Sequence, residues 1–294
     1  MNPTTIKNLI NRQGFKKTLF STNWLLFDRI TKIVLGLTVG IWMARYLGPE
    51  DFGKMNYAIS FVALFAPLSK LGLDQIVTRN IINKPADTDE ILGTSFLLKL
   101  VGNLVLVISS YFIIMMVSPT KEMLPLFVLI IGSSYIFKSF ETIDFFFQAK
   151  VSARYSAWGR IIGIAISSLL KVLFILYNQS LICFIWAIVI ENLFINVSFV
   201  ILYRIKFKIS PHKWKINIDK IKNLLKDGWP LILSGLAMAI YMKIDKVMLG
   251  FLTSDYGVGI YSAAARITEA SYFIPVAISI SLFPYILKSK NINL

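Results

Sequence analysis

The sequence predicts an all-α, polytopic membrane protein with about eight transmembrane helices, arranged as one six-helix lobe plus the first two helices of a parallel repeat lobe. Hydrophobic residues make up 56% of the 294-residue chain, and the mean hydropathy is +0.66, which is too apolar for a soluble domain. Apolar runs of roughly 20 residues, each long enough to cross a bilayer, recur along the whole length. The beginning of the chain is also partly repeated near its end.

The apolar runs and the residues that break them place the predicted helices in order. They lie at 22–45, 55–77, 91–117, 123–147, 156–177, 181–203, 229–251 and 258–287. Four short connectors rich in turn-forming residues alternate with longer ones, so they are expected to share one side of the membrane. These short connectors are 47–51, 118–120, 178–180 and 253–255.

Basic residues gather in the connectors of the opposite side, above all in 204–227, whereas the short connectors are flanked only by Lys54 and Lys121. Because cytoplasmic loops carry an excess of lysine and arginine, this bias predicts that both termini lie in the cytoplasm. The net charge of +15 is therefore explained by topology, and we expect no nucleic acid partner.

The domain organisation follows from these helices and connectors. We predict a basic cytoplasmic N-terminus (1–21), a six-helix transmembrane lobe (22–203), a cytoplasmic linker with an amphipathic helix (204–228) and an incomplete C-terminal lobe (229–294). No cleaved signal peptide is expected, because the first apolar run is too long and lacks a cleavage site. The single cysteine, Cys183, excludes disulfides and cysteine-based metal sites, so neither a metal nor a cofactor is predicted.

A weak internal repeat supports two similar lobes. Trp24 corresponds to Trp229, and the turn 51–53 (DFG) corresponds to the turn 255–257 (DYG), at an offset of about 205 residues. The helices before both turns run in the same direction, which is typical of transporters built from parallel repeats. By this symmetry the second lobe looks incomplete, although a chance similarity between two such turns remains an alternative.

Many ionisable residues lie inside the predicted helices. Each costs about 2.5–3.5 kcal/mol on insertion scales, so such residues are expected to face a cavity or a partner. The basic ones outnumber the acidic ones at depth, which predicts an aqueous, cationic cavity that binds an anionic substrate. The predicted substrate-binding residues are Arg29, Lys32, Lys99, Lys138, Lys243 and Arg266.

The acidic residues are predicted either to couple transport to an ion or to form structural ion pairs. They are Asp28, Glu141, Asp144, Glu191, Asp245 and Glu269. Asp28 and Lys32 are spaced i, i+4, and Arg266 and Glu269 are spaced i, i+3, so each pair is expected to neutralise itself. Glu191 stands alone in its helix and is either a coupling site for a proton or sodium ion, or the partner of a lysine on a neighbouring helix.

Two further patterns concern the fourth, fifth and seventh predicted helices. Lys138, Glu141 and Asp144 are spaced i, i+3 and i+6, which puts them in a stripe along one helix face. Arg160 and Lys246 lie near helix ends, where long basic side chains often extend to the membrane surface. We therefore expect the stripe to face either a cavity or an ion-pair partner, and these two cations to extend to the membrane surface.

The stretch ARYLGPEDFG (44–53), continued by NYA (56–58), KLGLD (70–74) and Arg79, resembles the N-terminal signature of the polysaccharide flippases. These are the Wzx-type O-antigen and capsule transporters of the multidrug/oligosaccharidyl-lipid/polysaccharide exporter superfamily. The entry to the seventh helix, GWP (228–230), also looks like this family. The resemblance covers the whole chain at lower specificity.

This resemblance implies two six-helix lobes around a cationic cavity. It also implies flipping of undecaprenyl-pyrophosphate-linked oligosaccharide across the inner membrane for O-antigen, lipopolysaccharide or capsular polysaccharide biosynthesis, driven by an ion gradient. Membrane lipids and the polysaccharide polymerase machinery are the implied partners. Such transport does not use ATP, and the sequence agrees with this because it lacks the glycine-rich phosphate-binding loop of ATP-hydrolysing proteins. Family members have 12 to 14 helices, so the chain resembles a C-terminally truncated flippase, and an inactive remnant is the alternative.

Two other classes of function remain as weaker alternatives. A membrane-embedded, glycan-processing enzyme would need clustered acids or metal ligands, whereas the only histidine, His212, lies in the basic loop. A drug exporter that carries cations would favour an acidic pocket. We therefore predict that the protein is not an enzyme.

Overall fold

The computed structural model describes residues 13–118 and 121–271, and within these ranges the chain forms helices and connecting loops and no strand. This confirms the predicted all-α class. In the described residues, five helical segments are long and apolar enough to cross a membrane, namely Leu26–Leu64, Pro85–Val117, Leu124–Ala149, Ala153–Leu176 and Leu181–Phe207. The last predicted helix, 258–287, lies partly outside the described residues.

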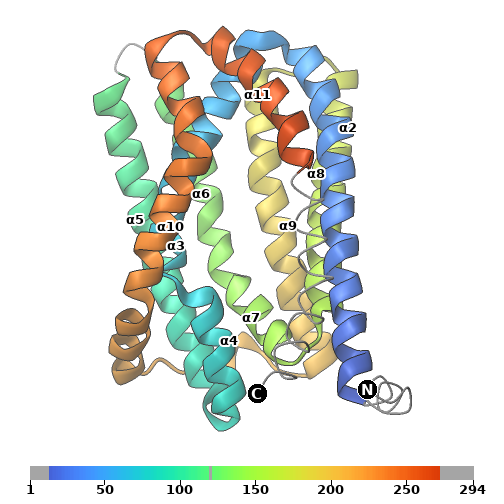
Figure 1. The fold of residues 1–294 in the computed structure, drawn as a ribbon, viewed down its shortest axis with the longest axis vertical. Helices are drawn as coiled ribbons and strands as arrows, with labels where there is room; N and C mark the ends of the chain where they lie inside the picture. Colours follow the sequence, from blue (N-terminus) through green and yellow to red (C-terminus); the bar gives the residue numbers. More distant parts are fainter. Residues whose placement is uncertain (1–12, 119–120, 272–294) are drawn as a thin grey trace, which may run out of the picture.

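Helix α2 (Gln13–Leu64) contains the first predicted helix and the start of the second, joined by a sharp kink at Gly48. Gly48 has φ 71°, a left-handed conformation that favours glycine because it has no Cβ. Pro49 follows and begins the second part of the helix. Figure 1 shows the blue ribbon turning over at this point, so the two parts of α2 run in different directions.

The second predicted helix, 55–77, is not continuous, so its prediction as one straight span is wrong. After α2 the chain forms the short α3 (Ala66–Lys70), with Pro67 in its first turn, and then α4 (Leu73–Asn83). Between them Gly72 has φ 65° and ends the helical path. A proline has no N–H for the helix ladder, and a left-handed residue redirects the chain. These breaks turn α4 away from the axis of α2.

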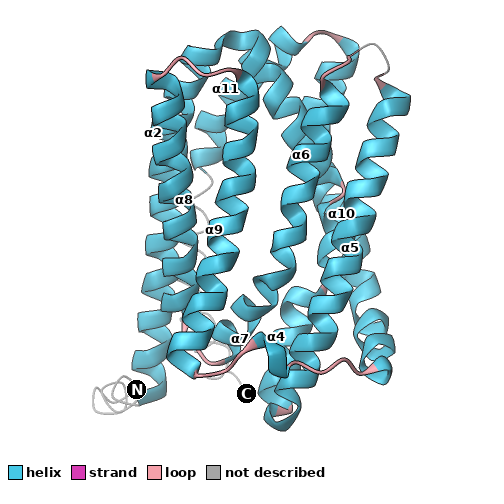
Figure 2. Cartoon of the chain, turned by 180° about the vertical axis from the view of Figure 1, so that it is seen from behind, coloured by secondary structure: helices cyan, strands magenta, loops and turns pink. Residues whose placement is uncertain are grey.

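The remaining elements follow the predicted order. They are η1 (Pro85–Asp87), α5 (Thr88–Val117), α6 (Leu124–Phe137), η2 (Lys138–Glu141), α7 (Thr142–Ala149), α8 (Ala153–Leu176), α9 (Leu181–Phe207), η3 (Pro211–Lys213), α10 (Ile218–Leu252) and α11 (Asp255–Ser271). The fourth predicted helix is interrupted by the 3₁₀ turn η2. Figures 1 and 2 agree that α2, α8 and α9 form one side of the molecule, α5 and α10 the other, with α6 between them.

The amphipathic segment and the seventh predicted helix are one helix, α10, which continues through Pro230. The side chain of Asn217 caps it by accepting hydrogen bonds from two backbone N–H groups. Lys220 then forms ion pairs with Asp87 (2.9 Å) and Glu90 (2.8 Å). Burial alone would lower the pKa of Lys220, but the two carboxylates raise it above its ordinary value. The start of α10 is therefore fastened to η1 and α5.

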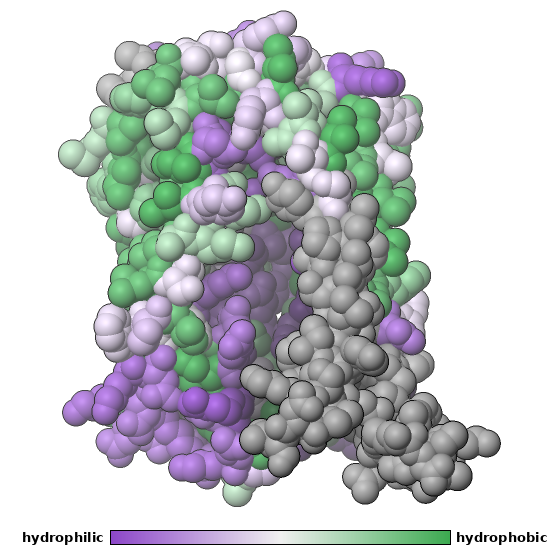
Figure 3. Space-filling view, viewed as in Figure 1, coloured by the Kyte–Doolittle hydropathy of each residue, from purple (hydrophilic) through white to green (hydrophobic). Residues whose placement is uncertain are grey.

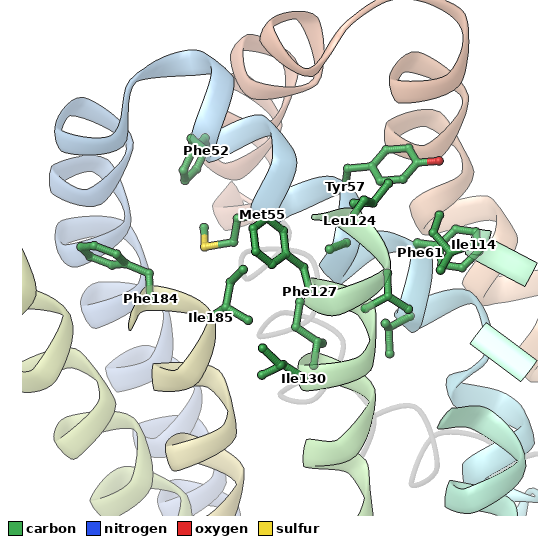
Figure 4. Packing of buried hydrophobic residues seen from close by; sticks show 14 of the residues in the cluster. Phe52, Met55, Tyr57, Phe61, Ile114, Leu124, Phe127, Ile130, Phe184 and Ile185 are labelled. Atoms are coloured by element: carbon green, nitrogen blue, oxygen red, sulfur yellow. The ribbon is translucent and has the colours of Figure 1, made fainter. Parts of the chain in front are cut away.

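Apolar side chains form two buried clusters at the two ends of the helices. One contains Phe52, Phe127 and Phe184, contributed by α2, α6 and α9 (Figure 4). The other contains Leu92 and Tyr203, from α5 and α9, together with residues of α4, α7 and α10.

The short connectors that follow the first part of α2, α8 and α10 lie at the upper end of the molecule in Figure 1, as do the end of α5 and the start of α6. The connectors rich in basic residues lie at the lower end, where Figure 3 shows hydrophilic side chains below a more hydrophobic surface. The helices therefore alternate in direction as predicted. We call the two ends the short-connector end and the basic end.

Candidate functional site

Three adjoining cavities of about 1030, 670 and 470 Å³ lie between the helices. Lys32 and Glu191 line both the first and the second, Lys70 and Asp74 line both the first and the third, and Met242 lines the second and the third. We treat them as one space, the central cavity. Figure 3 shows hydrophilic side chains inside a hollow at this position.

The central cavity is closed toward the short-connector end by contact between the two repeated turns. Gly53 of α2 lies against the backbone oxygen of Asp255, and Gly259 of α11 lies against that of Pro49, both so closely that a Cβ would overlap these oxygens. Lys121 also pairs with Asp255 at 2.6 Å. At the other extreme, the lining reaches Asn83 beside η1. The cavity thus extends toward the basic end.

Basic side chains outnumber acidic ones in the lining of the central cavity. The basic residues are Arg29, Lys32, Lys70, Arg79, Lys138, Arg160, Lys171, Lys243 and Arg266. The acidic residues are Asp74, Glu141, Asp144, Glu191 and Glu269. The low dielectric of the surrounding protein strengthens the field of this net positive lining. The arrangement favours an anion inside the cavity.

One arginine joins three helices beside the cavity. The guanidinium of Arg160 on α8 lies 3.1 Å from Asp28 of α2 and 2.5 Å from Asp144 of α7, and Gln148 donates to Asp144 at 2.9 Å. The Oδ1 atoms of both aspartates are buried and have no hydrogen-bond partner among the described residues. The predicted Asp28–Lys32 pair is therefore replaced by a pair across helices, and Arg160 does not extend to the membrane surface.

Lys99 does not line the central cavity, in contrast to its prediction as a substrate-binding residue. Its side chain is 1% exposed, and its Nζ lies 3.1 Å from Oε2 of Glu141 and 4.8 Å from the centre of the Phe145 ring. Glu141, on η2, does line the cavity, with a side chain 31% exposed. The carboxylate thus separates the buried ammonium group from any cargo.

Lys138 and Glu191 both line the cavity, and each has a different kind of partner. The Nζ of Lys138 lies 3.8 Å from the centre of the Tyr135 ring, a cation–π contact. Glu191 forms an ion pair with Lys171 at 3.2 Å, across α9 and α8. Of the two alternatives predicted for Glu191, the structure has the pair with a lysine on a neighbouring helix.

Glu269 of α11 forms its ion pairs with lysines of α10 rather than with a basic residue of its own helix. Its Oε1 lies 3.1 Å from Lys246 and 3.8 Å from Lys243, so the pair predicted with Arg266 is not formed. Packing of α10 against α11 brings these two lysines closer to Glu269 than Arg266, its neighbour one turn away on α11. Lys246 has a side chain only 7% exposed, so the prediction that it extends to the membrane surface is wrong.

Arg29, Lys32 and Arg266 form no ion pair within the described part of the chain, and all three line the part of the cavity between α2, α8 and α11. Gly36 has no atom within 4 Å of where a Cβ would lie, and the guanidinium of Arg266 occupies the space beside Gly40. The glycines leave room along α2 for a ligand and for this arginine. The guanidinium of Arg266 also lies 5.2 Å from the centre of the Phe52 ring, a cation–π contact like that of Lys138 with Tyr135. The three cations differ from Lys138 in sharing one part of the cavity.

Some residues of the site were not predicted, and Asp245, like Lys99 and Asp28, was predicted but is not among the residues that line the central cavity. Lys70, Asp74 and Arg79 enter the cavity because α3 and α4 break away from α2; the helix-breaking proline and glycine near them were the signal. Asp245 accepts a hydrogen bond from the Tyr261 hydroxyl and is not among the lining residues. In the described ranges, no three His, Cys, Asp or Glu side chains are placed to hold a metal ion.

Comparisons with known proteins agree with this architecture. The model of a family described as polysaccharide biosynthesis protein matches residues 18–290. A MOP superfamily transporter from Pyrococcus furiosus, reported with a binding pocket of reverse polarity that suggests a different function, has a TM-score of 0.67 and 16% identity, over 88% of this chain and 61% of that one. No curated protein matches the chain.

Two structures of multidrug resistance MATE family transporters of the MOP superfamily are also similar. The outward-facing conformation has a TM-score of 0.66 and 16% identity, covering 90% of this chain and 62% of that one. The inward-facing conformation has a TM-score of 0.59 and 16% identity, with coverages of 81% and 58%. At these identities the likeness shows the fold alone. The chain spans less than two thirds of the length of these transporters.

Proposed function

Because the chain belongs to the polysaccharide biosynthesis protein family, we propose that it translocates undecaprenyl-pyrophosphate-linked oligosaccharides across the bacterial inner membrane for the synthesis of O-antigen or capsular polysaccharide. The family and the transporter fold point to a transporter rather than an enzyme. The observation that carries the proposal is the net positive lining of the central cavity. A diphosphate needs such a lining when it leaves water.

The diphosphate of the cargo is assigned to Arg29, Lys32 and Arg266. These side chains are not neutralised by a carboxylate of the described chain, and they line the same part of the cavity. Arginine binds phosphate oxygens with two parallel N–H donors, whereas lysine acts as a point charge. Open space beside Gly36 lets the ligand approach the backbone of α2. Lys138 and Lys243 add positive charge elsewhere in the cavity.

We further propose a membrane orientation, a lobe organisation and partners for the protein. We place the basic end in the cytoplasm, so the central cavity receives cargo from the cytoplasmic leaflet. The segment 22–203 acts as one lobe, 229–294 belongs to a second lobe, and 204–228 links them. Membrane lipids surround the protein, and polysaccharide polymerase machinery takes the product. The positive cavity argues against a drug exporter that carries cations.

Binding of the lipid diphosphate tests the proposal. We expect the purified chain in lipid nanodiscs to bind undecaprenyl pyrophosphate, and the variants Arg29→Gln and Arg266→Gln to bind it about tenfold more weakly each, because each loses a charge-assisted contact. Lys222→Gln is the matched control, since Lys222 is exposed on α10 and lines no part of the cavity. The measurement is the dissociation constant by native mass spectrometry.

Two outcomes would contradict this assignment. Equal binding by the control and the cavity variants would show that the three cations are structural. Absence of binding to undecaprenyl pyrophosphate, together with binding of the lipophilic cation tetraphenylphosphonium, would favour a drug exporter. Restored surface polysaccharide in a bacterium lacking its own flippase would exclude the inactive-remnant alternative.

Coupling to an ion gradient is assigned to the Asp28–Arg160–Asp144 group. Two carboxylates share one guanidinium there, and each keeps a buried oxygen without a partner among the described residues. One proton bound at either oxygen would neutralise the excess negative charge of the group. In proteoliposomes, Asp28→Asn is expected to bind undecaprenyl pyrophosphate like the wild type but to lose the acceleration of flipping by an imposed pH gradient. Asp219→Asn, at an exposed position, is the control. Gradient-driven flipping by Asp28→Asn would refute the assignment.

A further inference from the structure

The ion pair between Lys99 and Glu141 presents its negative partner to the cavity, although the cavity is proposed to receive an anion. Lys99 is hidden, with a side chain 1% exposed, and Glu141 faces the cavity, with a side chain 31% exposed. A carboxylate in this position repels a diphosphate. Because the exposed carboxylate accepts hydrogen bonds, a neutral group that donates hydrogen bonds suits this part of the cavity better than a diphosphate does.

A purely structural role does not account for the pair. Moving two charges out of water costs several kcal/mol per ion, and apolar residues of similar volume would join α5 to η2 without that cost. An ionised carboxylate only accepts hydrogen bonds and offers about four lone-pair sites. Lys99 occupies Oε2 from behind at 3.1 Å, so it keeps Glu141 charged while the cavity side remains open to donors.

The turn that carries Glu141 is held in place by a second layer of hydrogen bonds. Asn103 of α5 donates to the Ser139 hydroxyl at 2.9 Å, and the Ser69 hydroxyl of α3 donates to Asn103. Asn103, Ser139 and Ser69 are all buried. Because these contacts fix η2 between α3 and α5, Lys138 and Glu141 are presented to the cavity in a fixed geometry.

The neighbours of Glu141 are suited to a polyhydroxylated ligand. Tyr135 presents a ring with an apolar body and a polar hydroxyl, and the Nζ of Lys138 lies 3.8 Å from its centre. Asn192 of α9 donates to Ser134 at 2.9 Å, so its amide is oriented. All of Tyr135, Lys138, Glu141 and Asn192 line the largest part of the cavity. They combine acceptors, donors and an aromatic surface.

We propose that Tyr135, Lys138, Glu141 and Asn192 form a subsite for the sugar hydroxyls of the cargo, with Lys99 as a positioning residue behind Glu141. This inference rests on the proposed function and adds an orientation to it. The diphosphate lies between α2, α8 and α11, and the glycan lies toward α6, η2 and α9. Glu141 accepts hydrogen bonds from hydroxyl groups of the first sugars.

The test compares two probes with and without a sugar, undecaprenyl pyrophosphate and undecaprenyl-pyrophosphoryl-N-acetylglucosamine, on the full chain in nanodiscs. The wild type is expected to bind the glycosylated probe about tenfold more tightly, the effect of one or two charge-assisted hydrogen bonds. The double variant Lys99→Met/Glu141→Gln removes both charges together, so no buried charge is left unpaired. It is expected to lose this preference and to bind the sugar-free probe like the wild type.

Lys220→Met/Glu90→Gln is the matched control, because it also removes an ion pair between helices (α10 and α5, 2.8 Å) but lines no part of the central cavity. It is expected to keep the preference. If the first double variant is not recovered as folded protein, Asn192→Ala tests the same subsite and leaves the ion pair intact. Its expected result is again loss of the sugar preference.

The outcomes separate this inference from the proposed function. A sugar preference that survives Lys99→Met/Glu141→Gln, or its absence from the wild type, would overturn the subsite while leaving diphosphate binding in place. Failure of the wild type to bind either probe would instead count against the proposed function. A thermal midpoint measured for each variant identifies any loss of binding that comes from unfolding.

Discussion

Replacing Arg160 with leucine is expected to destabilise the protein more than any other single cavity substitution. Arg160 is the shared partner of Asp28 and Asp144, whose side chains are only 11% and 7% exposed. Removing one partner of a buried ion pair costs about 3–5 kcal/mol, because the remaining charges stay unpaired. The loss is measured as a fall in the thermal midpoint in detergent, or as reduced yield of monodisperse protein.

Arg154→Leu provides the control for this experiment on the same helix. Arg154 is exposed and contacts the hydroxyl of the adjacent Tyr155, so its loss is expected to change stability by no more than about 0.5 kcal/mol. The triple variant Arg160→Leu/Asp28→Asn/Asp144→Asn is expected to recover much of the stability, because no charge remains to be paired. Equal midpoints for Arg160→Leu and Arg154→Leu would show that the group does not hold the helices together.

The second large effect is expected from Gly53→Ala, which adds a Cβ where α2 meets the backbone oxygen of Asp255. The obstacle is backbone, so it cannot rotate aside, and the two repeated turns must separate. Overpacking of this kind costs about 1–3 kcal/mol. We expect the short-connector end to open more often, which shifts the protein away from the state with a cavity open toward the basic end.

A buried cysteine reports this opening. With Cys183 replaced by serine, Val258→Cys places a thiol at a position that is 0% exposed on α11. Its labelling by a maleimide is expected to be about tenfold faster in Gly53→Ala, since each 1.4 kcal/mol changes an opening equilibrium tenfold. Gly36→Ala is the control on the same helix, because nothing lies within 4 Å of its added Cβ. Equal labelling rates would contradict a closing role for the repeated turns.

The alternation of helices was predictable because it depends only on local composition. Runs such as 91–117 and 181–203 are apolar enough to span a bilayer by themselves, and α5 and α9 begin or end within a few residues of these limits. The breaks were less predictable. Gly48 and Pro67 signal that a turn exists, but the direction that α4 takes afterwards depends on packing against α5 and α7.

The partners of the charged residues show the limit of sequence reasoning most clearly. Spacing along one helix predicted pairs of Asp28 with Lys32 and of Glu269 with Arg266. The structure pairs these acids instead with Arg160 and Lys246, which lie on other helices. An i, i+4 neighbour is available at every turn, yet a partner across a helix interface is desolvated with the acid and binds it more strongly.

The sequence by itself determined that this chain is a bundle of membrane helices, that its connectors alternate in charge, and that a positive interior must exist, because the cost of placing groups in lipid depends on composition and length alone. The tertiary structure decided which cations remain available. Arg29, Lys32 and Arg266 face the cavity without an ion pair among the described residues, whereas Lys99 is enclosed behind Glu141. Burial and pairing depend on how helices far apart in the chain pack together, and a local sequence pattern does not show which helices will be neighbours.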